Sequence, residues 1–110
     1  MSNYHYLDLT LELPKGLKRE IPAVFFKKHV MQALNALFGE VGASTTVDLL
    51  KYESIPHRAV LRVPSVYYVK LRSSLTLAGD YEGIPCAYRI HKSSTYLLNL
   101  LGDSRNYNHE

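Results

Sequence analysis

The sequence predicts an α+β fold, a ferredoxin-like sandwich in which one antiparallel sheet carries two helices on one face and a further helix follows at the C-terminus. Two observations support this fold. The hydrophobic pattern has a period of two in four segments and a helical period in two others. These segments follow one another as strand, helix, strand, strand, helix, strand, which is two split βαβ units. The 110 residues suffice for one domain, 1–110, with a core of about 4–102 and a polar tail at 103–110.

The first strand is predicted over residues 4–13, YHYLDLTLEL, because apolar and polar side chains alternate there. The proline and glycine of PKG, residues 14–16, end it. Leu7, Leu9, Leu11 and Leu13 fall on the buried face of this strand, while Tyr4, Tyr6, Asp8, Thr10 and Glu12 fall on the solvent face.

The period changes to about 3.6 in residues 22–38, PAVFFKKHVMQALNALF, which predicts a helix. Pro22 suits the first helical turn, and Gly39 suits the C-cap. The stripe that we expect to pack on the sheet comprises Phe26, Val30, Ala33, Leu34 and Leu37.

The second half repeats this order. Residues 47–53 and 57–63 predict a hairpin, because two strand patterns are joined by the short link SIP. Ser65 can cap a second helix that runs to about Ala78 and ends at Gly79. Residues 84–91 predict the last strand, and SSTYLLNLLG predicts a short helix capped by its serines. The core stripe of the second helix is Tyr68, Leu71, Leu75 and Ala78.

The sequence contains few signs of catalysis. Its five histidines form no ligand pair and its single cysteine, Cys86, lies in an apolar strand pattern, so we expect no metal, no cofactor and an inert thiol. No phosphate-binding loop and no G-x-S-x-G elbow is present. A small hydrolase that uses Asp8 or His91 is the enzymatic alternative. We also expect no secretory signal and no membrane span.

Positive charge is concentrated in the second half of the chain. The formal net charge is +3, but residues 51–92 hold seven basic residues against three acidic ones. Aromatic side chains beside arginines on an open sheet can stack on unpaired bases and bind phosphates. On the second helix, Lys70 and Arg72 lie beside Ser73 and Ser74 and can contact phosphate oxygens. The candidate RNA-binding residues are therefore Tyr4, Tyr6, Arg58, Arg62, Lys70, Arg72, Arg89 and Lys92.

Plainer interpretations stand beside this hypothesis. Exposed arginines on strands are commonly just solvated, and tyrosines often pack beneath a loop. The C-terminal helix is apolar nearly all round, so it forms either a lid on the domain's own core or an interface with another protein. The candidate protein-interface residues are Tyr96, Leu97, Leu98 and Leu101.

Three segments resemble a known family. ALFGEVGAS (36–44), LLKYES (49–54) and LRSSLTLAGDYEGIPCAYRI (71–90) resemble the small protein subunits of eukaryotic and archaeal ribonuclease P and ribonuclease MRP. The resemblance runs from about Tyr4 to Arg105. It implies a sandwich similar to RNA-recognition domains.

The resemblance also implies a function. The family works in a ribonucleoprotein that removes the 5′ leader from precursor tRNA, and the RNA of that particle carries the catalysis with divalent metal ions. For this chain the resemblance implies a location in the nucleus and nucleolus. The expected partners are the ribonuclease P RNA and other ribonuclease P or MRP protein subunits, with precursor tRNA bound indirectly and no membrane. The alternative is a scaffold between proteins, in the same or the MRP particle, with little direct RNA contact.

Overall fold

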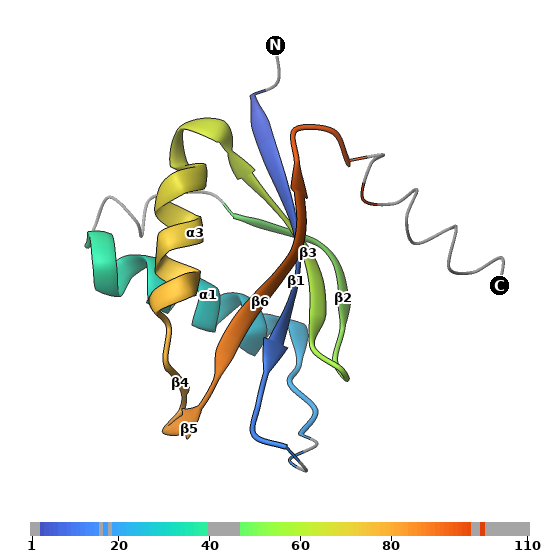
Figure 1. The fold of residues 1–110 in the computed structure, drawn as a ribbon, viewed down its shortest axis with the longest axis vertical. Coiled ribbons are helices and arrows are strands. Elements are labelled where there is room, and N and C mark those ends of the chain that lie inside the picture. Colours follow the sequence, from blue (N-terminus) through green and yellow to red (C-terminus); the bar gives the residue numbers. More distant parts are fainter. Residues whose placement is uncertain (1–2, 16, 18, 40–46, 98–99, 101–110) are drawn as a thin grey trace, which may run out of the picture.

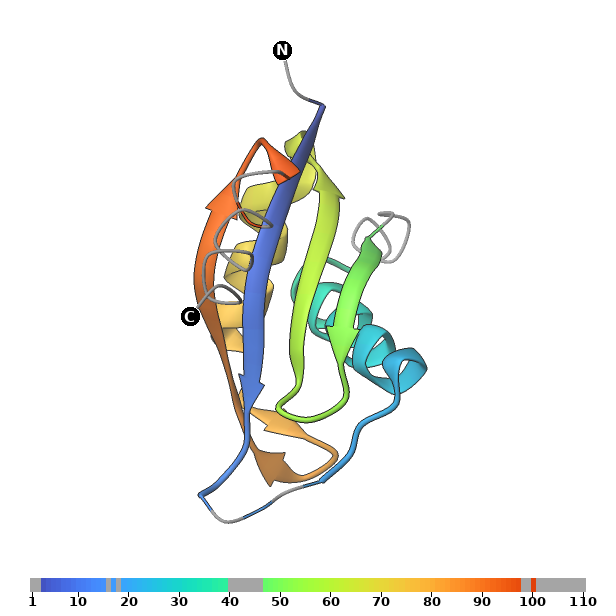
Figure 2. The ribbon, with the colours of Figure 1, turned by 90° about the vertical axis from the view of Figure 1, so that its right-hand side faces the viewer.

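In the computed structural model, which describes residues 3–15, 17, 19–39, 47–97 and 100, a four-stranded antiparallel sheet carries two helices on one face (Figures 1 and 2). The strands are ordered β2-β3-β1-β6. This is the order expected when two split βαβ units interlock, so the predicted ferredoxin-like sandwich is confirmed. The bounds of the sheet strands are β1 Tyr4–Glu12, β2 Asp48–Glu53, β3 Arg58–Pro64 and β6 Ala87–Ser94.

The core lies between this sheet and the two helices. The odd-numbered leucines of β1 are buried, as its alternating pattern predicts, and Leu7 and Leu9 lie opposite Leu61 and Ala59 of β3. Tyr88 of β6 lies opposite Leu11 on the same face. The even-numbered residues of β1 therefore point to the other face of the sheet, away from the helices.

Helix α1, Ala23–Phe38, begins after Pro22, whose carbonyl accepts hydrogen bonds from the two N–H groups of Phe25 and Phe26. It ends at Gly39, where φ is +62° and the N–H donates to the carbonyl of Asn35 at 2.7 Å. A positive φ favours glycine, so the predicted C-cap is confirmed. The side chains that α1 buries are Phe26, His29, Val30 and Leu34.

One residue of the predicted α1 stripe is exposed. Leu37 was expected in the core, but it lines a groove between α1 and α3 instead. Phe38, the next residue, packs partly against the core. Near the C-terminal end of α1, the side of the helix that faces the core therefore contains Phe38 in place of Leu37.

The second helical segment begins as a 3₁₀ turn, Ser65–Tyr67, and continues as α3, Tyr68–Leu77. The predicted serine cap is wrong, because the Ser65 hydroxyl bonds to His5 Nδ1 at 3.0 Å and caps no helix. The helix ends one residue earlier than expected, with Ala78 in an extended conformation. The predicted core stripe is confirmed, since Leu71 and Leu75 are fully buried.

The segment after α3 differs from the single strand predicted over residues 84–91. A small hairpin of β4, Asp80–Tyr81, and β5, Ile84–Pro85, precedes β6. Its turn uses positive φ angles at Glu82 and Gly83, and β6 then continues to Ser94.

The predicted serine caps of the C-terminal helix are therefore strand residues. The structure assigns helix to Leu97 and Leu100, but residues 98–99 and 101–110 lie outside the described part of the chain. The C-terminal helix and the polar tail at 103–110 are thus not described as elements. Within the described residues, no helix is both long enough and apolar enough to cross a membrane.

Candidate nucleic-acid interface

Six of the eight candidate RNA-binding residues lie on one surface, the face of the sheet opposite the helices. We call this the open face. Tyr6 of β1 lies opposite Arg62 of β3. Thr10 lies opposite both Arg58 and Arg89, so both arginines share its face. Residues of three strands are thereby placed together on this face: Tyr4, Tyr6, Arg58, Arg62, Arg89 and Lys92.

A bulge in β6 adjusts the register of this face. The pairing with β1 shifts between Asp8 and Leu9, which lie opposite Lys92 and Ile90 and leave His91 as the extra residue. His91 Nε2 shares a hydrogen bond with the Thr10 hydroxyl at 2.7 Å. The bulge therefore keeps Lys92 on the open face although it is three residues from Arg89.

The arginines of the open face are paired with carboxylates. Arg58 makes a bidentate contact with Asp8, with Nε and Nη2 donating over 2.9 and 2.7 Å. Asp8 was predicted on the solvent side of its strand, yet only 6% of its surface is exposed. Asp8 does lie on the face opposite the helices, but it is paired with Arg58, and Val60 opposite it on the same face is buried as well. A buried and paired carboxylate is poorly placed to act as a catalytic base.

Arg62 is paired in a similar way. Its Nε and Nη2 both donate to one oxygen of Asp48, at 3.0 and 2.8 Å. This hydrogen bonding raises the pKa of Arg62 above its ordinary value. The guanidinium also lies 4.9 Å from the ring centroid of Tyr4, so one face of that ring is covered. Because Arg62 lies over the Tyr4 ring, less of the guanidinium is available to bind a phosphate and less of the ring is available to stack on a base.

Arg89 is the least constrained of the three arginines. Its Nη1 is 3.7 Å from Glu12, and two thirds of its side chain is exposed. An ion pair at this distance between exposed groups is weak. Arg89 therefore has the most available guanidinium among the arginines of the open face.

The other two candidate residues lie in the helix layer, on the opposite side of the sheet. Arg72 Nη1 donates to the Tyr68 hydroxyl at 2.6 Å, and Lys70 Nζ lies 5.4 Å from the ring centroid of Phe38. Ser74, predicted beside them on the helix surface, is buried and donates to the Lys70 carbonyl. The structure thus divides the predicted RNA-binding set between two surfaces.

The candidate protein-interface residues are only partly described. Tyr96 is exposed, and its N–H donates to the Ser94 hydroxyl at 2.9 Å. Leu97 is half-buried. Leu98 and Leu101 lie outside the described residues.

Pattern reasoning did not identify a buried histidine behind the sheet. His29 of α1 donates from Nε2 to the Asp80 carbonyl at 2.7 Å, and its Nδ1 shares a hydrogen bond with the Tyr88 hydroxyl at 2.6 Å. Burial raises the pKa of Tyr88 above its ordinary value. The signal was present, since position 29 follows Phe26 by three residues and so lies on the apolar stripe. Both ring nitrogens are engaged, so His29 links elements together.

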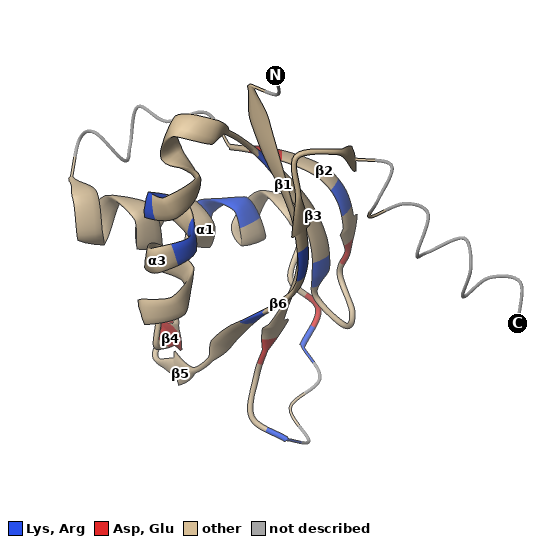
Figure 3. Ribbon diagram, turned by 45° about the horizontal axis from the view of Figure 1, so that its top comes forward, with Lys and Arg blue, Asp and Glu red and all other residues tan. Residues whose placement is uncertain are grey.

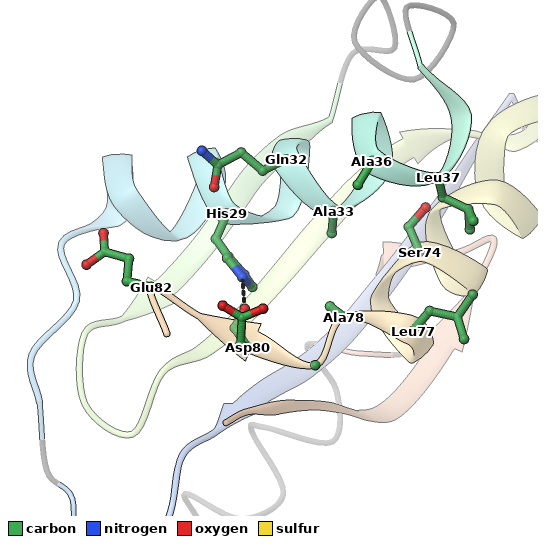
Figure 4. Close-up of a pocket in the computed structure, with 11 residues that line it drawn as sticks. His29, Gln32, Ala33, Ala36, Leu37, Ser74, Leu77, Ala78, Asp80 and Glu82 are labelled. Carbon is green, nitrogen blue, oxygen red and sulfur yellow. Dashed lines mark hydrogen bonds between the residues drawn. The ribbon is translucent and has the colours of Figure 1, made fainter. Parts of the chain in front are cut away.

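A hollow adjoins this histidine. It is a groove of about 550 Å³ between α1 and the end of α3, with His29 and Asp80 at one end and Leu77 at the other (Figure 4). The charged side chains that line it are Asp80 and Glu82. Two carboxylates make this groove a poor site for a polyanion.

The described residues also bear on metal and thiol chemistry. They contain no group of three or more histidine, cysteine, aspartate or glutamate side chains placed to hold a metal ion. The Cys86 thiol is half-buried, and desolvation raises its pKa. A thiol with a raised pKa is a poor nucleophile, which agrees with the inert role predicted for it.

Comparisons with known proteins find similarity over nearly the whole chain. A model of the Rpp14/Pop5 family matches residues 6–97. The protein named ribonuclease P protein subunit p14 from Homo sapiens is 43% identical over 104 residues, which are 94% of this chain and 83% of that protein. Its namesake from Mus musculus is 44% identical over 105 residues, with 94% and 84% covered.

A solved structure has the same fold. A chain in the cryo-EM structure of yeast ribonuclease MRP superposes with a TM-score of 0.78 at 15% identity, covering 98% of this chain and 95% of that one. At this identity the likeness concerns the fold alone.

Proposed function

Because the chain belongs to the Rpp14/Pop5 family, we propose that it is a non-catalytic protein subunit of the ribonuclease P ribonucleoprotein. In this role it supports RNA folding and assembly in a particle that removes the 5′ leader from precursor tRNA, while the RNA carries the catalysis. The observation that carries the proposal is the similarity to ribonuclease P protein subunit p14, which covers 94% of this chain and 83% of its human relative.

The geometry is compatible with an accessory role. The two side chains that a hydrolase hypothesis would use are both engaged, Asp8 with Arg58 and His91 with Thr10. The open face presents tyrosines and arginines, but Arg58 and Arg62 are held by carboxylates. Such a face is suited to contacts that position a partner and less suited to catalysis.

The partners and the location follow from the same proposal. The chain binds the ribonuclease P RNA and other protein subunits of the particle, and precursor tRNA reaches it indirectly. It acts in the nucleus and nucleolus. The RNA contacts that we propose are those of the open face, with Lys70 and Arg72 as a second, separate contact.

A native purification tests this function. A tagged full-length chain is purified from an extract of its own cells at moderate salt, and the eluate is assayed for precursor-tRNA 5′ cleavage and for ribonuclease P RNA. We expect both to be enriched over a mock purification. Soluble chain that recovers neither would refute the proposal.

A second candidate function is favoured by the ion pairs of the open face. Arg58, Arg62 and Arg89 each contact a carboxylate, so a large part of the positive charge there is neutralised within the chain. A scaffold between protein subunits, in ribonuclease P or in the MRP particle, needs no strong RNA contact and fits this pairing. The two candidates differ in how RNA association responds to charge changes on this face.

A further inference from the structure

The helix α3 has a second apolar stripe, on the side turned away from the core. Val66, Val69 and Leu77 are 80, 70 and 69% exposed. Val66 lies in the 3₁₀ turn that precedes α3. Within α3, at 100° per residue, Val69 and Leu77 fall within one sector, opposite the buried Leu71 and Leu75. Figure 1 shows α3 beside α1, on the helix side of the sheet. We call Val66, Val69, Ser73, Thr76 and Leu77 the outer stripe.

The surface of the outer stripe is hollowed. A shallow hollow of about 340 Å³ lies on it, with Val69 and Leu77 among its lining residues and the small Ser73 and Thr76 between them. The Thr76 hydroxyl donates to the Arg72 carbonyl at 2.9 Å, so its hydrogen-bonding capacity is satisfied within the helix. Large side chains that flank small ones form the ridges and grooves by which helices pack.

The charges beside the stripe specify the partner further. Neither α1 nor α3 contains an acidic residue, and α3 carries Lys70 and Arg72 (Figure 3). Arg72 is held beside the stripe by its bond to Tyr68. A guanidinium has five N–H donors, so donors remain for a carboxylate. The complementary surface is apolar along its centre and acidic at its border.

We propose that the outer stripe binds an amphipathic helix of another protein subunit, with acidic side chains placed to meet Arg72 and Lys70. This inference rests on the proposed function for the presence of other subunits. RNA fits the surface less well, because three exposed aliphatic side chains would face a charged backbone. The carboxylates of Asp80 and Glu82 also line the groove that Leu77 enters. Large aliphatic side chains that are exposed together on one side of a helix are typical of protein contacts.

A cross-linking experiment in the intact particle tests the proposal. A photoreactive benzoylphenylalanine replaces Val69 in the full-length tagged chain, cells are irradiated, and the cross-linked peptide is sequenced from particles that contain ribonuclease P RNA. We expect a peptide of a different protein subunit with apolar residues at helical spacing and acidic residues beside them. A cross-link to RNA, to a second copy of this chain, or to no protein would overturn the proposal.

A matched substitution separates this inference from the proposed function. In V69Q/L77Q we expect at least a tenfold loss of the cross-linked subunit from the purified particle. In the control V24Q we expect none, because Val24 is equally exposed but lies on α1. Melting temperatures within a few degrees of wild type exclude unfolding. If wild type and both variants recover the subunit equally, this inference is wrong and the proposed function stands. If wild type recovers no ribonuclease P RNA, the proposed function is wrong, and so is the inference that rests on it.

Discussion

Asp8 joins two central strands through a nearly buried carboxylate. Its bond to Arg58 is bidentate, and 9% of its side chain is exposed. Substitution by alanine leaves the guanidinium of Arg58 without this partner. Charge-assisted hydrogen bonds of this kind contribute about 1.5–3 kcal/mol. We therefore expect Asp8→Ala to lower the free energy of unfolding by about 2 kcal/mol, measured by urea denaturation of the purified chain.

The control is the neighbouring pair. Asp48 holds Arg62 with both groups about one third exposed, so we expect Asp48→Ala to cost less than about 1 kcal/mol. Equal losses in the two variants would contradict the importance that we assign to the burial of Asp8.

Tyr52 makes stability depend on pH in the alkaline range. Its hydroxyl donates to the Ile21 carbonyl at 2.5 Å, and burial raises its pKa from 10.0 to about 12. Between these values the unfolded chain loses the tyrosine proton while the folded chain retains it, so the folded state loses stability as pH rises. Below pH 10 both states are protonated and this contribution is constant.

We expect Tyr52→Phe to show a shallower fall in stability between pH 10 and 12 than wild type. Urea midpoints at pH 9 and pH 11.5 measure the difference. Part of the fall will remain, because burial also raises the pKa values of Tyr81 and Tyr88. Identical falls in wild type and variant would mean that Tyr52 ionises equally in both states.

At the scale of elements, His29 connects α1 to the hairpin and to the edge strand β6. It bonds to the Asp80 carbonyl and the Tyr88 hydroxyl. In His29→Leu both groups lose this bond, and the hydroxyl of Tyr88 is then a buried polar group without it, whereas Asp80 is exposed to water. We expect an unfolding free energy lowered by about 1–3 kcal/mol in urea denaturation, the cost of an unpaired buried polar group. Gln32→Leu, an exposed change one turn away, is the control, and equal effects would refute this role of His29.

The sequence predicts elements well where one periodicity extends over many residues. β1 and α1 are predicted because each has a regular apolar stripe, which β1 buries and which α1 leaves exposed only near its end, at Leu37. The extent of β6 is not predicted, because Ser93 and Ser94 resemble helix caps in the sequence. In the structure, Ser93 belongs to the strand and accepts a hydrogen bond from the Tyr68 hydroxyl on the core side of the sheet. The β4–β5 hairpin was also missed, since two-residue strands have no detectable period. Local patterns cannot show which tertiary partner a polar residue will find.

At the scale of the whole molecule, charge is arranged by surface. The sheet carries both signs, while α1 and α3 carry only cations (Figure 3). The sequence predicts which arginines share the open face, because strand order and alternation determine it. It does not predict their neutralisation, because Asp48 meets Arg62 only through the register of β2 on β3. The burial of Asp8 is not predicted either, because its pairing with Arg58 depends on the register of β1 on β3.

Arg89 allows the two candidate functions to be compared. If the open face contacts RNA phosphates, Arg89→Gln removes one phosphate contact and lowers the salt slope of RNA association by about 1. If the chain is a scaffold between proteins, the slope stays unchanged. Lys27→Gln, which removes one charge from α1 on the other side of the sheet, is the matched control. Retention of ribonuclease P RNA by the purified particle across a salt series is the measurement.

Precursor tRNA in cells depleted of this chain shows directly whether the chain is a working subunit of ribonuclease P. The 5′ leader is scored by RNA blotting before depletion, after depletion, and after re-expression of the full-length chain. We predict that precursors with uncut 5′ leaders accumulate on depletion and disappear on re-expression. Normal leader removal in depleted cells would mean that the chain is not needed for ribonuclease P activity.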